Sequence, residues 1–322
     1  MNKRVLVTGI GGNVGQGIVR NIISFGHGIR ILGADVKGVS GGNHLCDKVY
    51  TVPFGDSPKY IPAVKKICER ESIDLIIPST DYETYYLALA KDKLPTLAGS
   101  DANIALVFLN KYKTYIEFKK KKIPFAKTIL PSKYKKEFSE IFVKPVEGRG
   151  SRDIHINPPN PSKFSDEFII QKLYKGTEIT TGFYVTKNKK LLGQITFRRT
   201  LEHGTTVVCE VVFNYDKEVE KLIKKIIRNF DIRGSCNIQS VVTKKGRIVP
   251  FELNCRISGT NSIRAQFGFE DVKYTLEEHL YNKIPKKPKI MKGAAVRILM
   301  DIIYPGIGLD KIKDKSTKHY MS

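Results

Sequence analysis

The chain contains few cysteines, and none are arranged as metal ligands. The five cysteines, at positions 46, 68, 209, 236 and 255, form no CxxC pair and no Cys/His cluster. This usage is typical of reduced, mostly buried thiols. It disfavours a structural zinc site.

Long apolar runs are also missing. No segment of the 322 residues is apolar over the length needed to cross a bilayer, and the N-terminus reaches Gly9 too soon for a signal peptide. We therefore expect a cytoplasmic protein with no membrane partner. The length and a hydrophobic fraction of 41% suit two or three domains with ordinary cores.

Acidic residues are scarce beside basic ones. There are 32 Asp and Glu against 55 Lys and Arg, which gives a formal net charge of +23. Clustered lysines would indicate nucleic-acid binding, because they neutralise phosphates. Here the lysines are spread along the chain without a helix-turn-helix, finger or aromatic stacking platform, so we expect no nucleic-acid partner. The positive field favours the arrival of anions such as ATP and carboxylates.

The first 100 residues show a regular α/β alternation. Buried strands are predicted at 4–9, 29–35, 48–52 and 74–78, and helices from the turn at 9–17 to about Phe25, at 58–71 and at 82–90. The fold class predicted from this pattern is α/β, opening with a parallel sheet.

The glycine-rich turn at 9–17 has more than one interpretation. Such a turn can hold a dinucleotide, and Asp35 ends the second strand where a ribose-binding acid would lie. A lone turn of this kind is at least as often a packing device or a subsite for another anion, and no region for hydride chemistry follows it. Its role stays open.

The middle of the chain offers a basic, glycine-rich loop. A helix is predicted at 103–122, followed by extended runs at 127–130, 141–144 and 153–156. The loop at 145–152 is not a Walker loop, since no Gly-Lys-Ser/Thr opens a helix. Its backbone N–H groups can wrap oxyanions, with charge from Lys144 and Arg149. A mobile, polar hairpin tip is the alternative.

A third run, 167–178, passes from a buried strand to an acid. The backbone groups of Lys172 and Leu173 are candidates for reading an adenine edge, and Glu178 for accepting ribose hydroxyls. An interdomain linker is the alternative.

Polar and apolar residues alternate from Glu252 to Ser258, so an extended backbone places Glu252, Asn254, Arg256 and Ser258 on one face. Carboxylate and amide oxygens suit Mg²⁺, and a guanidinium suits phosphoryl oxygens. A hairpin turn centred on Lys244 and Lys245 would bring Asn237 opposite Glu252, with Gln239 as its diagonal neighbour. Pro250 costs a ladder hydrogen bond, so an exposed edge or a one-residue slip of register is expected there. A merely solvated polar face is the alternative for this stretch taken alone.

These features resemble one family in their order along the chain. The residues that carry the resemblance to the ATP-grasp enzymes are Lys111, Lys144 with its glycine-rich loop, Gln171 to Glu178, Gln239, Glu252 and Asn254. The ending Glu252-x-Asn254-x-Arg256-x-Ser258 looks most like the synthetase domains of carbamoyl phosphate synthetase large subunits. Cys255 stands where that family usually has proline, and Gln171 where it usually has glutamate.

The resemblance implies a Rossmann-like domain at 1–103 and an ATP-grasp fold whose subdomains span 104–172 and 173–290, before a strand and polar tail at 291–322. It implies that ATP and one or two Mg²⁺ are cofactors, with Mn²⁺ as an alternative. The implied nucleotide residues are Lys111, Lys144, Gly148, Arg149, Gly150, Ser151, Gln171, Lys172, Leu173 and Glu178. Gln239, Glu252 and Asn254 would hold the metal, and Arg256, Lys144 and Asn254 would act in phosphoryl transfer.

The implied reaction is ATP-dependent ligation of a carboxylate to an amine through an acyl phosphate. The chain has one such module and no glutaminase segment, so we expect a stand-alone ligase. A kinase acting on a small carboxylate or related metabolite, and a non-catalytic nucleotide-binding subunit, are the alternatives. The acceptor-site candidates are Arg198, Arg199, the turn at 202–206 with Thr205 and Thr206, and the segment 79–81 with Asp81. The expected partners are a small carboxylate and an amine whose identities are not predicted, and a homodimer is the candidate assembly.

Overall fold

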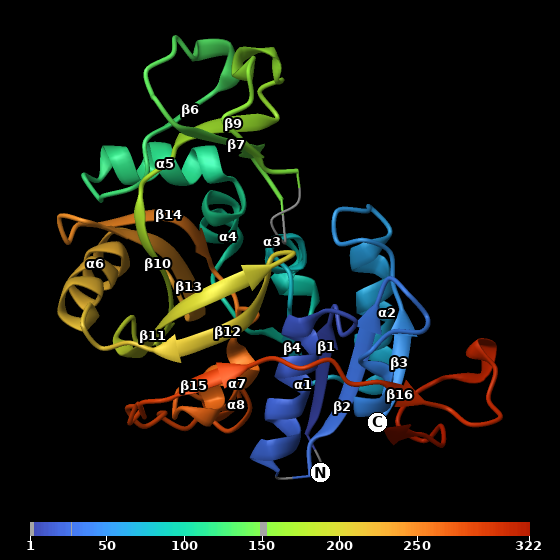
Figure 1. Ribbon diagram of the computed structural model, residues 1–322. Coiled ribbons are helices and arrows are strands. Elements are labelled where there is room, and N and C mark those ends of the chain that lie inside the picture. The colour runs from blue at the N-terminus through green and yellow to red at the C-terminus, as the bar shows by residue number, and fades with distance from the viewer. Residues whose placement is uncertain (1–2, 27, 149–152) are drawn as a thin grey trace.

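The computed structural model describes residues 3–26, 28–148 and 153–322, and they form three main sheets (Figure 1). The first sheet is parallel, in the order β3-β2-β1-β4-β5. Its strands are β1 (Arg4–Thr8), β2 (Arg30–Asp35), β3 (Lys48–Thr51), β4 (Leu75–Ile77) and β5 (Thr96–Leu97). The connecting helices are α1 (Asn13–Phe25), α2 (Tyr60–Glu71) and α3 (Asp81–Leu89). Because parallel strands end at the same edge, the turns after β1, β2 and β4 meet there.

The predicted helix at 103–122 is two helices. Helix α4 (Ala102–Leu109) ends at Asn110, and α5 (Lys111–Lys120) begins directly after it. The Asn110 side chain accepts a hydrogen bond from the backbone N–H of Lys113, at 2.9 Å. Asparagine is a favoured residue at a helix start because its oxygen satisfies an otherwise unpaired N–H group. That cap starts a new helix where the apolar pattern suggested a continuous one.

The second sheet is small and antiparallel, in the order β6-β9-β7-β8. Its strands are β6 (Thr128–Ile129), β7 (Ile141–Pro145), β8 (His155–Ile156) and β9 (Phe168–Lys172). It lies at the top of Figure 1, away from the first sheet. The segment that joins β7 to β8 contains the predicted phosphate loop.

The third sheet has six antiparallel strands in the order β14-β13-β10-β11-β12-β15. The strands are β10 (Gly176–Val185), β11 (Leu191–Glu202), β12 (Thr205–Val211), β13 (Gly234–Thr243), β14 (Ile248–Asn254) and β15 (Ala294–Val296). Helix α6 (Asp216–Asn229) covers one face with Val219, Leu222, Ile223 and Ile226, which recur at the helical spacing of an apolar stripe. Helices α7 (Asn261–Gln266) and α8 (Asp271–Leu280) follow β14.

The third sheet is joined to the first unit through Asn261. Its amide donates to the carbonyl oxygen of Val14 at 3.2 Å, and Asn21 donates to its side-chain oxygen at 3.1 Å. A Cβ at Gly17 would lie only 2.5 Å from that oxygen, so a glycine is needed for helices α1 and α7 to approach this closely.

The C-terminal segment returns from the third sheet to the first unit. After β15 the chain runs to the short pair β16 (Ile302–Ile303) and β17 (Tyr320–Met321), which lies beside the first sheet in Figure 1. The backbone N–H of Lys315 donates to Cys46 at 3.0 Å, and the Asn43 amide donates to the carbonyl of Lys313 at 2.9 Å. Within the described residues, no helix is long and apolar enough to cross a membrane.

Candidate active site

Two cavities meet above the third sheet. The larger, of about 690 Å³, lies between the carboxyl edge of the first sheet and strands β11 to β14. The smaller, of about 330 Å³, lies between the second and third sheets. Both volumes are in the range of small-molecule sites. The residues that line both cavities are Pro145, Gly148, Leu201, Gln239 and Glu252. Ligands in the two cavities would therefore meet at Gln239 and Glu252.

The hairpin that carries this junction has a different register from the one predicted. Gln239 pairs with Glu252, and Asn237 pairs with Asn254 instead of Glu252. The register shifts between Gln239 and Ser240, where Pro250 pairs with Ser240 and Phe251 is the extra residue. Proline has no N–H for the ladder, so a bulge here costs little. The alternation after the bulge is as expected: Glu252, Asn254, Arg256 and Ser258 all line the larger cavity.

Glu252 lies among cations. Burial by itself would raise the pKa of its carboxyl, but the charges of Lys111 and Lys144, the hydrogen bond from Asn254 and the charge of Arg256 together lower it below its ordinary value. The Asn254 amide donates to Glu252 Oε1 at 3.2 Å. Glu252 is therefore an anion at neutral pH, which a metal ligand must be.

Two buried lysines face the smaller cavity. Lys144 on β7 is 7% exposed, and Lys111 at the start of α5 is 8% exposed. Burial lowers the pKa of Lys144 to about 8, with Lys111 acting in the same direction and Glu252 and Glu178 opposing it. Lys111 Nζ donates to the carbonyl of Gly148 at 3.3 Å, at the start of the predicted phosphate loop. Lys111 thus contacts the start of the loop predicted to cover a triphosphate, and Lys144 lines the same cavity as Gly148.

We predict that ATP binding weakens as the pH rises through about 8. Lys144 has its pKa lowered to about 8, so its ammonium is mostly present at pH 7 and mostly lost at pH 9. Raising the pH from 7 to 9 should therefore increase the dissociation constant for ATP by about tenfold. Calorimetric titration of ATP at pH 7.0, 8.0 and 9.0 measures this. The same slope in Lys144→Met would contradict the assignment to Lys144.

The protonation of Lys144 also makes the free energy of unfolding depend on pH. The pKa of Lys144 is lower in the folded chain than in the unfolded one, so between pH 8 and the unfolded value near 10.5 the unfolded chain binds more protons. The contribution of this one group to the free energy of unfolding therefore rises across that window.

Arg199 connects three of the predicted site residues. Its guanidinium donates to Glu178 Oε1 at 3.0 Å, to Gln239 Oε1 at 2.7 Å and to Thr206 Oγ1 at 3.3 Å. The Arg199 side chain is only 10% exposed. It therefore fixes the predicted ribose acid relative to the junction of the cavities.

Arg198 and Thr205 lie outside the two cavities. Arg198 is the neighbour of Arg199 on β11, so its side chain points to the opposite face, where it forms an ion pair with Glu210 and is 62% exposed. Thr205 pairs with Glu202 at the hairpin end, and it is the next residue, Thr206, that lines the larger cavity. The predicted acceptor role of Arg198 and Thr205 has no support in this geometry.

Asp81 and Arg256 form an ion pair across the larger cavity. Arg256 Nε and NH2 donate to Asp81 Oδ2 at 3.2 and 2.8 Å, and both side chains are about 15% exposed. Asp81 begins α3 of the first unit, so this pair joins the two walls of the cavity. An anion bound at Arg256 would therefore lie next to Asp81.

The glycine-rich turn after β1 also lines the larger cavity. Gly9, Gly12 and Asn13 face it, but Asp35 is occupied: its oxygens accept from the backbone N–H groups of Gly11, at 2.7 Å, and Lys37, at 3.1 Å. A Cβ at Gly15 would lie 2.3 Å from the carbonyl oxygen of Gly9, so this glycine has a packing reason. Asp35 is engaged by the turn itself and is not free to bind a ribose.

The smaller cavity is mostly apolar, as an adenine site would be. Its apolar lining includes Ala126, Phe142, Ile154, Val241, Val249 and Phe251. The predicted adenine residue Gln171 also lines it, but its amide nitrogen donates to Thr128 Oγ1 at 3.0 Å. The N–H groups of Lys172 and Leu173 donate to the carbonyls of Lys127 and Glu140, both at 2.9 Å. These N–H groups are used within the protein, so they do not read a base edge in this arrangement.

Part of the predicted phosphate loop lies outside the described residues. Gly148 lines both cavities, whereas Arg149, Gly150 and Ser151 lie outside the described residues. Their predicted contact with the nucleotide stays a prediction.

The donors at the junction fit Mg²⁺ that arrives with a nucleotide. The described residues contain no group of three or more His, Cys, Asp or Glu that could hold a metal. Glu252 offers a carboxylate and Asn254 an amide oxygen, while Gln239 Oε1 already accepts from Arg199. One carboxylate with amide oxygens suits Mg²⁺, which keeps waters and takes further oxygens from phosphates.

Sequence reasoning missed several residues of the larger cavity. Asp56 and Glu83 line it without having been noted, and Asn237 had been noted only as a strand neighbour of Glu252. Asn237 is 2% exposed, and its side-chain oxygen accepts from Thr180 and Ser258. The alternation of Asn237 with Gln239 on one strand face was the signal that could have found it.

Comparison with known families agrees with this architecture. The model described as "PylC-like, N-terminal domain" matches residues 5–98, and the model described as "ATP-grasp domain" matches residues 108–260. Residues 108–260 therefore belong to the ATP-grasp domain family. The predicted family and the predicted fold class are thereby confirmed. The narrower likeness to carbamoyl phosphate synthetase stays a prediction.

Several solved structures share this fold at low sequence identity. N5-carboxyaminoimidazole synthetase from Staphylococcus aureus, complexed with ADP, has a TM-score of 0.76 at 11% identity, covering 93% of this chain and 83% of that one. The biotin carboxylase domain of Hydrogenobacter thermophilus 2-oxoglutarate carboxylase, in complex with MgADP, ADP and bicarbonate, has a TM-score of 0.71 at 15% identity. The match covers 89% of this chain and 71% of that one. L-amino acid ligase from Bacillus licheniformis has a TM-score of 0.67 at 12% identity, and the match covers 90% of this chain and 75% of that one. A comparison with curated proteins gave no match.

Proposed function

We propose that this ATP-grasp chain is an ATP-dependent carboxylate–amine ligase that works through an acyl phosphate. The observation that carries the proposal is the junction of the two cavities at Gln239 and Glu252. A nucleotide in the smaller, apolar cavity would direct its phosphates to that junction, and an acid in the larger, polar cavity would approach from the other side. Effective catalysis requires this kind of juxtaposition.

The side chains around the junction match the needs of the first step. A carboxylate oxygen of the substrate attacks the γ-phosphorus, the bond to the β–γ bridging oxygen breaks, and ADP leaves with the electron pair. Two anions must be brought together, so cations are needed first. Lys111 and Lys144 lie on the nucleotide side and Arg256 on the acid side. Glu252 and Asn254 are the proposed ligands of Mg²⁺, which supplies charge neutralisation on the phosphates when bound.

The second step needs an amine in the larger cavity. The amine nitrogen attacks the acyl carbon, phosphate leaves, and a proton is released. The wall formed by the first unit carries Asp56 and Asp81, which would attract an ammonium-bearing substrate. One structural neighbour is an L-amino acid ligase, which supports an amino acid as one of the substrates.

Measuring ADP release tests the proposal. The full chain with ATP and Mg²⁺ is screened against pooled small carboxylates, amino acids included, with and without pooled amines. We expect ADP release that requires an acid and that an amine accelerates, with an amide product in mass spectra. A phosphorylated acid as the final product would identify a kinase instead, and ATP binding without ADP release in every pool would identify a binding protein.

A further inference from the structure

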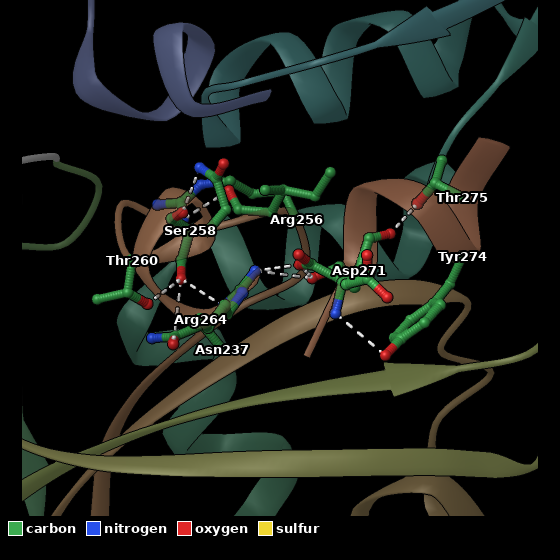
Figure 2. A network of polar contacts seen from close by, with 12 residues as sticks. Asn237, Arg256, Ser258, Thr260, Arg264, Asp271, Tyr274 and Thr275 are labelled. Carbon is green, nitrogen blue, oxygen red and sulfur yellow. Dashed lines mark hydrogen bonds and ion pairs between the residues drawn. The ribbon is translucent and has the colours of Figure 1, made fainter. Parts of the chain in front are cut away.

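A buried ion pair lies beneath the larger cavity, formed by Arg264 of α7 and Asp271 of α8 (Figure 2). Both side chains are 0% exposed, and Arg264 is the largest fully buried side chain among the described residues. Its guanidinium also lies over the ring of Phe269, with 5.6 Å between Cζ and the ring centroid. The pair makes no contact with the lysines and acids assigned above.

The pair is connected to the cavity wall by hydrogen bonds. Arg264 NH1 donates to Ser258 Oγ at 2.9 Å, and Ser258 Oγ donates to Asn237 Oδ1 at 3.2 Å. The hydroxyl of Thr180 donates to the same Asn237 oxygen at 3.1 Å. Since the oxygen half of the amide receives both hydroxyls, the NH₂ half is directed away from them. Ser258 and Asn237 both line the larger cavity, so that half is available to a ligand there.

Stability alone does not account for this arrangement. Neither Arg264 Nε nor Asp271 Oδ1 has a hydrogen-bond partner among the residues that the structure describes. Burying two charges costs several kcal/mol each, and well-packed apolar replacements are often as stable. Strand β10 also has a glycine, Gly182, where a Cβ would lie 2.5 Å from Arg264 NH1. The absence of a side chain at Gly182 therefore leaves space for the Arg264 guanidinium.

We propose that Arg264 and Asp271 are positioning residues that hold Ser258, and through it Asn237, so that the Asn237 amide donates a hydrogen bond to the acid substrate in the larger cavity. This inference rests on the proposed ligase function. The Arg264 charge fixes the direction of the Ser258 hydroxyl and polarises the chain of bonds. The Asn237 N–H groups then oppose the negative charge that develops as the acyl group reacts.

The test replaces the pair by apolar residues of similar size, Arg264→Met with Asp271→Leu. We expect the melting temperature to stay within about 3 °C of the parent, because the apolar pair avoids the cost of burying charge. We expect kcat to fall about 100-fold, because a misplaced group near the reaction centre has effects of that size, while KM for ATP changes by less than about twofold. Full kcat in this double variant would overturn the proposal.

A mutant cycle identifies the route of the effect. Ser258→Ala removes the link between the pair and Asn237, so it should reproduce the loss of kcat, and adding it to the double variant should cost little more. Losses that add fully would show that the pair does not act through Ser258. Lys273→Met is the control, since Lys273 lies on the same helix as Asp271 but forms a 3.0 Å exposed pair with Glu270.

Hydrogen exchange gives a readout that needs no substrate. In the apolar double variant, we expect faster exchange in residues 254–261 at unchanged melting temperature, because the hydrogen bond from Arg264 to Ser258 is lost. Unchanged exchange would overturn the positioning role. If the parent protein releases no ADP with any acid, the ligase proposal fails, and the exchange measurement still decides whether the pair holds this loop.

Discussion

Replacing Glu252 with glutamine is expected to lower acid-dependent ADP release by about 10³-fold, the loss seen when one charge-stabilising group is removed from a reaction centre. Glu252 lies where both cavities meet, and its carboxyl has a pKa below the ordinary value because cations surround it. Glutamine keeps the size and one oxygen but removes the charge. The variant would leave Lys111, Lys144 and Arg256 without their shared counter-charge and would weaken binding of Mg²⁺.

Steady-state ADP release with a saturating acid measures this effect, and a titration of Mg²⁺ at fixed ATP separates metal affinity from turnover. Glu210→Gln is the matched control, because Glu210 is a half-exposed partner of Arg198 on the opposite face of the same sheet. A variant at Glu252 that retains turnover within a few-fold of the parent would remove this residue from the proposed mechanism.

Replacing Lys144 with methionine is expected to lower kcat/KM for ATP by about 10²- to 10³-fold. Methionine fills a similar volume in this buried position, so packing is kept while the ammonium is lost. Lys144 shares the smaller cavity with Lys111 and lies next to the junction with the acid, where the transferred phosphoryl would be. Removing one buried cation there lowers transition-state stabilisation more than nucleotide binding, so kcat should fall more than KM rises.

Initial rates over a range of ATP concentrations distinguish the two parameters. Lys175→Met serves as the control, since Lys175 is 70% exposed and pairs with Glu140 at the end of the same small sheet. Equal losses in the two variants would mean that the general positive field, and not the position of Lys144, is responsible.

Local sequence patterns predicted the strand faces well where the chain is regular. The alternation from Glu252 to Ser258 placed four polar residues on one face, and the structure has all four at one cavity. The slip of register expected at Pro250 is confirmed by the bulge at Phe251. The predicted pairing was already one residue off on the turn side of the bulge, so pairs beyond it differ from the prediction by two residues. A bulge depends on how the ladder accommodates Pro250, which spacing alone does not fix.

The same limit explains the two arginines of β11. Sequence proposed Arg198 and Arg199 together, but adjacent residues of a strand face opposite sides, so only one of them can line a cavity. Which one depends on the pairing with β10 and β12. Arg199 lies inside with Glu178 and Gln239, and Arg198 lies outside with Glu210.

Contacts between distant segments were beyond sequence reasoning. Asp81 and Arg256 are 175 residues apart and meet only because the first unit docks against the third sheet. Arg264 had no signal at all, since an arginine in a polar stretch is ordinarily exposed. Its burial depends on the space left by Gly182 on a strand some 80 positions earlier.

The path of the C-terminal segment has a mechanical consequence. Residues after β15 run back from the edge of the third sheet and fasten to Cys46 and Asn43 of the first unit. Among the described residues, two covalent passages therefore join the first unit to the rest of the chain, one at residues 98–101 and one beyond residue 296. Because helix α8 also shares a hydrophobic core with β1 and α1, the two walls of the larger cavity would stay together even if the second passage were cut.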